Sequence, residues 1–318
     1  MAETVAIEWP ALPYAAWKDT RDTLHLWTQI VGKIRLAQTP WINHSWHVAL
    51  YLTARGLTTS VIPHGARAFA IDFDFIDHVL VVRTSDGQVR QLMLMPMPVA
   101  QFHADLLAVL AELGLDVHID PMPNEVAEAI PFDRDRVHAS YDPDYAARFW
   151  RVLLSTHRVL ALFRTRFLGK VSPVHFFWGS FDLAVTRFSG RPAPPHPGGV
   201  PHLSDAVVRE AYSHEVSSAG FWPGGGGPVD YAAFYSYAYP APKDYSAAAA
   251  RPAQAFFSRE LGEFLLPYDA VRAASDPERM LMEFLQSTYE AAADLGGWDR
   301  AALECPSGEP RRPRPLVR

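Results

Sequence analysis

The chain has 318 residues, of which 49% are hydrophobic and 20% are charged, and its formal net charge is −6 at pH 7. This size and composition are typical of a globular protein, built as one large domain or two ordinary ones. The acidic balance argues against a nucleic-acid partner, because a nucleic-acid surface needs clustered Lys and Arg. Residues 301–318 are rich in Pro and Arg, and we expect them to form a disordered, solvated tail.

The sequence has one cysteine, Cys305, which excludes an internal disulfide and a cysteine-ligated zinc site. Its N-terminal residues include Glu3 and Glu8 and lack the basic and apolar regions of a secretory signal. No apolar run reaches the ~18 residues of a membrane span. We therefore expect a cytoplasmic protein with no membrane partner.

The first half of the chain predicts a helix, several strands and a second helix. Asp86-Gly87 between two apolar runs is a hairpin signal, and Gly114 stands where a helix-ending glycine is expected. The predicted elements are a helix over 14–36 with one apolar face, strands over 46–54, 58–63, 69–75, 79–84 and 89–95, and a helix over 99–113.

The second half predicts a similar order. Asp142-Pro143 is a helix start, because Asp caps the first turn and Pro suits it, and Asp276-Pro277 repeats the signal. The predicted elements are a helix over 142–167, a strand within 169–191, a Pro/Gly-rich loop over 191–204, a strand over 234–239 and a helix over 276–295.

Both halves thus predict helix, strands and helix. Each contains a Trp, Trp46 or Trp178, followed nine residues later by an Arg, Arg55 or Arg187. These observations favour an α+β fold of two pseudo-repeated halves, 1–135 and 136–300, packed as one unit, with a mostly antiparallel sheet covered by helices. Chance similarity between two buried strands is the alternative to duplication.

The most informative stretch is 169–191, GKVSPVHFFWGSFDLAVTRFSGR. On one extended strand, His175 and Arg187 point to one face, and Trp178 and Asp182 point to the other. The stretch therefore supplies only part of a site. Asp182 lies between apolar residues, and it is either a general base or ligand or one half of a structural ion pair, because an isolated buried charge is costly.

The histidines His44, His47, His175 and His214, with Glu215, contain metal-ligating groups but no metal-ligand spacing. Polar histidines near a pocket are the alternative reading, and we predict no metal site. Phosphate-binding, dinucleotide-binding and nucleophile-elbow glycine motifs are also missing from the sequence.

Aromatic residues are a clearer indication. Residues 175–240 contain 13 Phe, Trp or Tyr in 66 positions, against 12% aromatic residues in the whole chain. Small-molecule pockets are lined by apolar and aromatic groups with a few polar anchors, and a plain aromatic core is the alternative. The segment Phe221-Trp222-Pro223 leads into Gly224 to Gly227, which we expect to be a mobile loop or one that lies close to a ligand.

Four segments together resemble a known bacterial family. They are WKDTRDTLHLWTQIVGKIRL, TARGLTTSVIPHG, GKVSPVHFFWGSFDLAVTRFSGR and SSAGFWPGGGG. From about Trp17 to Leu295 the chain resembles the uncharacterised family named domain of unknown function 5996. The resemblance implies no activity, substrate or cofactor.

The leading hypothesis is a protein that binds a small organic molecule in an aromatic-lined pocket, with Arg187 holding an anionic group on the ligand. The predicted ligand-binding residues are Trp178, Arg187, Trp222, Tyr235, Tyr237, His44 and Trp46. Candidate catalytic residues are His175, Asp182, His214 and Glu215. The alternatives are a metal-dependent enzyme using the histidines and Glu215, and a non-catalytic protein-interaction module. The sequence leaves the reaction, the ligand, any cofactor and the oligomeric state open.

Overall fold

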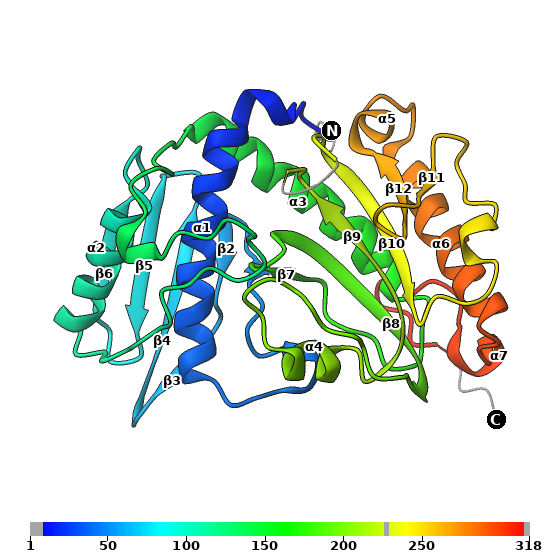
Figure 1. Ribbon diagram of the computed structural model, residues 1–318, viewed down its shortest axis with the longest axis horizontal. Helices are drawn as coiled ribbons and strands as arrows, with labels where there is room; N and C mark the ends of the chain where they lie inside the picture. Colours follow the sequence, from blue (N-terminus) through cyan, green and yellow to red (C-terminus); the bar gives the residue numbers. More distant parts are fainter. Residues whose placement is uncertain (1–8, 226–228, 315–318) are drawn as a thin grey trace.

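The computed structural model describes residues 9–225 and 229–314, which form two antiparallel sheets with helices packed against them (Figure 1). This is the predicted α+β class. The first sheet has the order β1 (Tyr51–Leu52), β2 (Gly56–Thr58), β4 (Arg67–Asp74), β5 (Val79–Thr84) and β6 (Val89–Met93), and β3 (Ile62–His64) pairs with β4. The hairpin between β5 and β6 turns at Gly87, whose φ of 88° suits glycine.

The second sheet lies in the second half of the chain. Its order is β11 (Phe256–Ser258), β12 (Glu263–Pro267), β10 (Ala233–Tyr239), β9 (His214–Trp222), β8 (Asp182–Pro192) and β7 (His175–Phe177). The two sheets meet where Leu50 and Phe176 exchange two backbone N–H···O bonds of 2.8 Å. Each half contains an antiparallel sheet with helices packed against it, but the equivalence of the halves stays a prediction.

Four long helices cover the sheets: α1 (Tyr14–Gln38), α2 (Val99–Glu112), α3 (Pro143–Arg164) and α6 (Pro277–Leu295). The predicted caps are present, since the Asp142 carboxylate accepts bonds from the Asp144 and Tyr145 amides and Asp276 accepts one from Arg279. Short helices complete the described chain: η1 (Asn43–Ser45), η2 (Phe132–Arg134), α4 (Asp205–Ala211), η3 (Tyr245–Ala247), α5 (Tyr268–Arg272) and α7 (Arg300–Leu303).

Helix α1 is the central element, and it is buried on all sides and not on one face as its spacing predicts. Every residue from Thr23 to Arg35 is buried. The helix contacts α2, α3 and β3, and Gly32 lies against the Trp178 ring, where an added Cβ would come within 2.2 Å of the indole. Buried polar groups on α1 therefore need partners in neighbouring segments.

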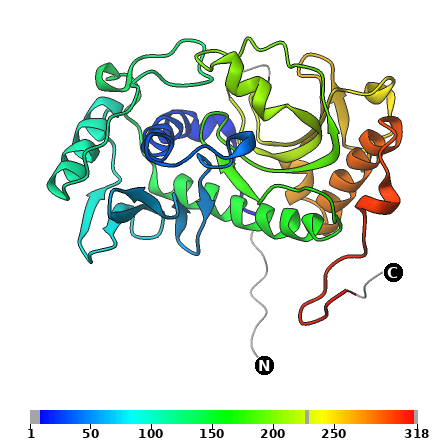
Figure 2. The same cartoon turned by 90° about the horizontal axis from the view of Figure 1, so that it is seen from below.

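The second sheet has helices on both faces. Helices α3 and α6 pack on one face, and α4 with its flanking loops covers part of the other (Figures 1 and 2). This arrangement leaves the α4 side of the sheet available for a site, while the α3 and α6 side forms core.

Two predictions in the strand regions are wrong. Over 46–54 only Tyr51–Leu52 form a strand, because His44 and Ser45 adopt left-handed φ values of 59° and 56° and the chain turns there. The stretch 169–191 is a hairpin and not one strand, since Phe177 pairs with Asp182 and residues 178–181 form the turn.

The C-terminal residues described by the structure fold back on α3. The Leu168 amide donates to the Leu303 carbonyl at 2.7 Å, and the Cys305 amide donates to the backbone carbonyl of Arg166 at 3.0 Å. Ordered contacts thus continue past residue 301, where we expected a disordered tail to begin. Within 9–225 and 229–314, no helix has both the length and the apolar composition to cross a bilayer.

Candidate functional site

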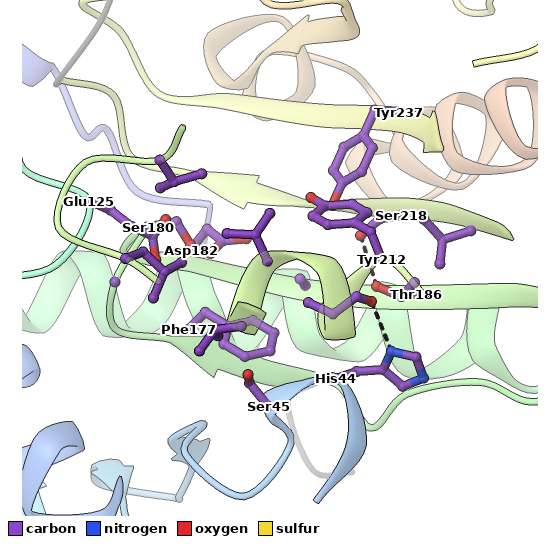
Figure 3. A pocket seen from close by; sticks show the side chains of 18 of the residues that line it. His44, Ser45, Glu125, Phe177, Ser180, Asp182, Thr186, Tyr212, Ser218 and Tyr237 are labelled. Carbon is purple, nitrogen blue, oxygen red and sulfur yellow. Dashed lines mark hydrogen bonds between the residues drawn. The ribbon is translucent and has the colours of Figure 1, made fainter. Parts of the chain in front are cut away.

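A cavity of about 530 Å³ lies between the second sheet and the segments around α4 (Figure 3). Its base is the sheet face formed by alternate residues of β8, β9, β10 and β12. The lining residues from these strands are Asp182, Ala184, Thr186, Phe188, Val216, Ser218, Trp222, Ala233, Tyr235, Tyr237, Glu263 and Leu265. The period of two along each strand explains why only every second residue contributes.

Strand register aligns polar groups across this base. Thr186 pairs with Ser218, and Ser218 pairs with Tyr237. The Thr186 and Ser218 hydroxyl oxygens are 2.8 Å apart. A row of hydroxyls therefore crosses the sheet inside an otherwise largely apolar cavity.

Segments from elsewhere in the chain cover the base. They are η1, the loop at Asn124 and Glu125, and α4 with the loop before it, whose lining side chains include Val200, Leu203, Val207 and Val208. The cover is tied down by the Glu125 amide, which donates to the Pro201 carbonyl at 2.9 Å, and by the phenol oxygens of Tyr212 and Tyr237, 2.8 Å apart.

Three carboxyl groups, Glu125, Asp182 and Glu263, line the cavity, and we call them the acidic cluster. Asp182 is 6% exposed and accepts hydrogen bonds from the Ser180 hydroxyl and the Tyr235 phenol. Burial raises the pKa of Asp182 above its ordinary value, although both bonds favour the carboxylate. Figure 3 shows Glu125, Ser180 and Asp182 together, away from His44.

The two glutamates have strongly shifted pKa values. Loss of bulk water, followed by the charge of Asp182, raises the pKa of Glu125 to about 7, and the same two causes raise that of Glu263 to about 7. Asp182 is therefore within electrostatic range of each of the two glutamates. Glu125 is exposed and Glu263 is half-buried, so solvent in the cavity screens part of the influence of Asp182 on both glutamates.

The acidic cluster has no cationic partner among the described residues. The residues that line the cavity include no Lys or Arg. No ion pair to Glu125, Asp182 or Glu263 occurs in 9–225 or 229–314. The cavity therefore presents negative charge whenever these groups ionise.

Buried residues of α1 hold Glu125 in place. The side-chain amide of Gln29 makes two hydrogen bonds with the Asn124 backbone. Its oxygen accepts from the Asn124 N–H at 2.8 Å, and its nitrogen donates to the Asn124 carbonyl at 2.9 Å. The His25 Nε2–H donates to the Gly179 carbonyl at 2.8 Å. Glu125 has a left-handed φ of 60°, and such strain persists only where the surroundings enforce it.

Two glycines make room for the cluster. An added Cβ on Gly179 would come within 2.1 Å of the Glu125 carboxyl, and one on Gly220 would come within 2.6 Å of the Tyr235 hydroxyl. Gly220 lies on β9, between β10, which carries Tyr235, and β8, which carries Asp182. Its missing side chain lets the phenol cross the strand and reach Asp182.

A second polar group lies at His44. Its Nδ1 is 2.8 Å from the Ala211 carbonyl oxygen, and its Nε2 is 2.5 Å from the Lys170 ammonium nitrogen. Burial lowers the pKa of His44, so this imidazole is neutral at physiological pH and accepts from Lys170. The Glu210 carboxylate accepts the His44 amide at 2.9 Å and connects α4 to η1.

The structure brings together seven of the residues predicted from the sequence. The residues that line the cavity are His44, Trp46, Trp178, Asp182, Trp222, Tyr235 and Tyr237. They come from η1 and its C-terminal end, the β7–β8 turn, and strands β8, β9 and β10.

Four predicted residues do not line the cavity. Arg187 is on the opposite face of β8, because it has the other strand parity from Asp182, and the predicted anchoring of a ligand in this cavity does not fit that position. Glu215 on β9 also faces away from the cavity, and its carboxylate forms an ion pair with Arg191 at 2.7 Å. His214 has the parity of the cavity face but stands beyond its edge, with its ring centre 5.9 Å from that of His44.

His175 corrects the parity argument. Because the stretch is a hairpin, His175 pairs with Ala184 and shares the face that lines the cavity, and it is not on the face of Arg187. Its ring lies behind Trp46 and Phe177 and is fully buried, with no hydrogen bond to either nitrogen among the described residues. Burial lowers its pKa to about 3, so it is neutral and out of reach of a ligand.

Sequence reasoning missed Glu125, Glu263 and Tyr212. Glu125 lies in a loop between α2 and α3 with no periodic pattern, and Glu263 begins a five-residue strand. Glu263 follows Gly262, and that turn signal before an apolar run is the one cue that could have located β12. Nothing local marks Glu125.

The structure also bears on the metal and glycine predictions. No three His, Cys, Asp or Glu side chains are grouped for a metal ion within the described parts of the chain. Gly224 and Gly225 do not line the cavity, whereas Gly226 and Gly227 lie outside the described residues.

Comparison with known proteins supplies the family and nothing further. No curated protein and no solved structure matches the chain. The model of the Family of unknown function (DUF5996) matches residues 9–305, in agreement with the resemblance seen in the sequence. Since this match covers most of the chain, the protein belongs to the DUF5996 family.

Proposed function

We propose that the protein binds a small organic amine, with an apolar body packed against the aromatic lining and a protonated nitrogen at the acidic cluster. The observation that carries this proposal is a cavity with three carboxyl groups and no Lys or Arg among its lining residues. A protonated amine donates hydrogen bonds and supplies the positive charge that these groups lack.

The size and lining of the cavity support a small molecule. Pockets for such ligands span roughly 300–1,000 Å³ and are mostly apolar with a few polar anchors, and this cavity of about 530 Å³ is within that range. Trp46, Trp178 and Trp222 contribute to the lining, and aromatic faces also attract cations.

The charge of the site favours an amine over the anionic ligand suggested by the sequence. A ligand carboxylate would face Glu125, Asp182 and Glu263 with no Lys or Arg among the lining residues to offset the repulsion, and juxtaposed like charges oppose binding. Arg187, the expected anchor, belongs to the other face of the sheet.

The remaining alternatives receive less support. Within the described residues the histidines and Glu215 do not form a metal-ligand set, which weakens the hypothesis of a metal-dependent enzyme. Seven of the predicted site residues line a concavity and do not form an exposed aromatic patch, and a concavity favours a small ligand over a protein partner.

A titration with 4-phenylbutylamine tests the proposal, because four tryptophans line the cavity and report binding by fluorescence. We expect saturable quenching. Ala184→Leu, which fills the cavity from its base, should abolish it, and Ala301→Leu on exposed α7 is the control that should not. Quenching that persists in Ala184→Leu, or none in the wild type, would reject the cavity as the binding site.

A further inference from the structure

A second cavity, of about 250 Å³, lies on the other face of the second sheet, where the C-terminal segment packs on the end of α3. Its lining residues are Arg166, Arg187, Gln286, Glu304, Cys305, Pro306 and Ser307. It shares no residue with the first cavity. It is small and polar, whereas the first is large and mostly apolar.

Arg187 is the central feature of this second cavity. Its side chain is 1% exposed, and its guanidinium carbon lies 3.5 Å from the ring centre of Phe163 and 4.3 Å from that of Tyr289. These aromatic faces stabilise the positive charge. Burial lowers the pKa of Arg187 to about 10, so the group stays protonated at neutral pH.

The hydrogen-bonding capacity of Arg187 is mostly unused. Its Nη2 donates to the Phe163 carbonyl at 2.5 Å. Its Nε and Nη1 have no partner within the described residues, and no carboxylate there is close enough to Arg187 for an ion pair. A buried cation with free donors and no anion is unfavourable unless a ligand completes it.

The neighbouring groups leave a net positive cavity. Arg166 adds a second guanidinium, and its Nε donates to the Ser307 hydroxyl at 2.7 Å, which leaves the hydroxyl hydrogen of Ser307 free to donate. The one carboxylate, Glu304, is engaged by Arg300, whose Nε lies at 2.5 Å and Nη2 at 3.2 Å. Two cations therefore face one anion that is already paired.

We infer that this second cavity binds a small carboxylate, held by Arg187, Arg166 and Ser307. A singly charged acid suits the cavity, because Glu304, although paired with Arg300, still lines it and would repel a dianion. The volume allows an acid of a few carbons, since a cavity of about 150 Å³ already holds benzene. This site is independent of the proposed amine site, and neither needs the other.

Cys305 provides a local reporter, because it lines the second cavity and is the one cysteine in the sequence. We would measure its alkylation by iodoacetamide in the full chain against increasing acetate, with chloride replaced to keep the ionic strength constant. The expected result is a saturable slowing of alkylation by at least about 3-fold, matched by heat on acetate titration in calorimetry. The absence of both would overturn the inference.

Variants separate anion binding from a general effect on the fold. Arg187→Gln and Arg166→Gln should each weaken acetate binding by about 10-fold or more, in line with a charged hydrogen bond. Arg191→Gln, a matched change on the same strand outside the cavity, should leave it unchanged. If the Arg187→Gln variant does not fold, the acetate affinity of the Arg166→Gln variant tests the inference by itself.

Glu304→Gln gives a prediction of the opposite sign. Removing this negative charge should tighten acetate binding by several-fold, which a loss of structure would not do. A carboxylate site at these residues would be contradicted if acetate slowed Cys305 alkylation equally in Arg166→Gln and the wild type. It would also be contradicted if phosphate slowed the alkylation and acetate did not.

Discussion

Asp182 and Arg187 belong to the same strand, β8, yet they face environments of opposite charge. Asp182, Ala184, Thr186 and Phe188 face the larger cavity, which contains carboxyl groups and phenols. Leu183, Val185 and Arg187 face α3 and α6, where a buried guanidinium is surrounded by aromatic rings. The alternation of a strand thus separates two chemistries, and polar residues that are close in sequence do not form one site.

The largest effect should come from removing the negative charges on the cavity face of the second sheet. The double variant Glu125→Gln, Glu263→Gln should weaken 4-phenylbutylamine binding by about 100-fold or more, since each charged hydrogen bond contributes ~1.5–3 kcal/mol. Calorimetry measures the affinity. Glu215→Gln makes the same chemical change on the opposite face and should leave the affinity unchanged; a loss in that control would remove the distinction between the faces.

The acidic face should also respond to pH. Glu125 and Glu263 have folded pKa values of about 7, above their ordinary value of 4.5, so they must lose a proton to bind an ammonium. Amine affinity should rise between pH 6 and pH 8 by about 10-fold for each carboxyl that must ionise, while the amine itself stays protonated. An affinity that is flat over this range would show that these carboxyls do not contact the ligand.

The same shifts predict the stability of the ligand-free protein. The folded state holds these two protons more tightly than the unfolded chain does, so their contribution favours folding at low pH and is lost as the pH rises from about 4.5 to about 7. Denaturant unfolding across this range measures it. In the double Gln variant this component of the pH dependence should disappear.

Gly220→Ala tests the support beneath the acidic face. The new Cβ would come within 2.3 Å of the Leu183 carbonyl oxygen and 2.6 Å of the Tyr235 hydroxyl, so the strand and the phenol must both shift. We expect a loss of about 1–3 kcal/mol in unfolding free energy, as for overpacked cores. Amine affinity should fall as well, because Tyr235 leaves Asp182.

Gly179→Ala should have the smallest effect on the fold. Its Cβ would meet the end of the flexible Glu125 side chain at 2.1 Å, which can move without disturbing the backbone. We therefore expect unchanged thermal stability and a several-fold weaker affinity for the amine. A large drop in the melting temperature with unchanged affinity would show that Glu125 has no part in binding.

The elements that the sequence predicts well are those with local signals. The helix caps Asp142 and Asp276 and the Asp86-Gly87 hairpin depend on residues within a few positions of one another. The hairpin at 178–181 escaped prediction because apolar and aromatic residues flank its turn on both sides and make a continuous strand-like pattern. That error placed His175 on the wrong face.

The site was only partly predictable for a related reason. Seven cavity residues are in the aromatic-rich half of the chain or at His44 and Trp46, where composition and the comparison of the halves pointed. Glu125 reaches the site through tertiary contacts with Gln29 and Gly179, which no local pattern encodes. Because Glu125 and Glu263 were missed, the sequence suggested an anionic ligand where the assembled cavity is acidic.

The central claim is tested most directly by calorimetry with three ligands that share one apolar body: 4-phenylbutylamine, 4-phenylbutanol and 4-phenylbutyrate. If the acidic cluster selects the charge of the ligand, the amine should bind at least about 10-fold more tightly than the alcohol, and the carboxylate should not compete for the cavity. Equal binding of the three, or tighter binding of the carboxylate, would contradict an amine site.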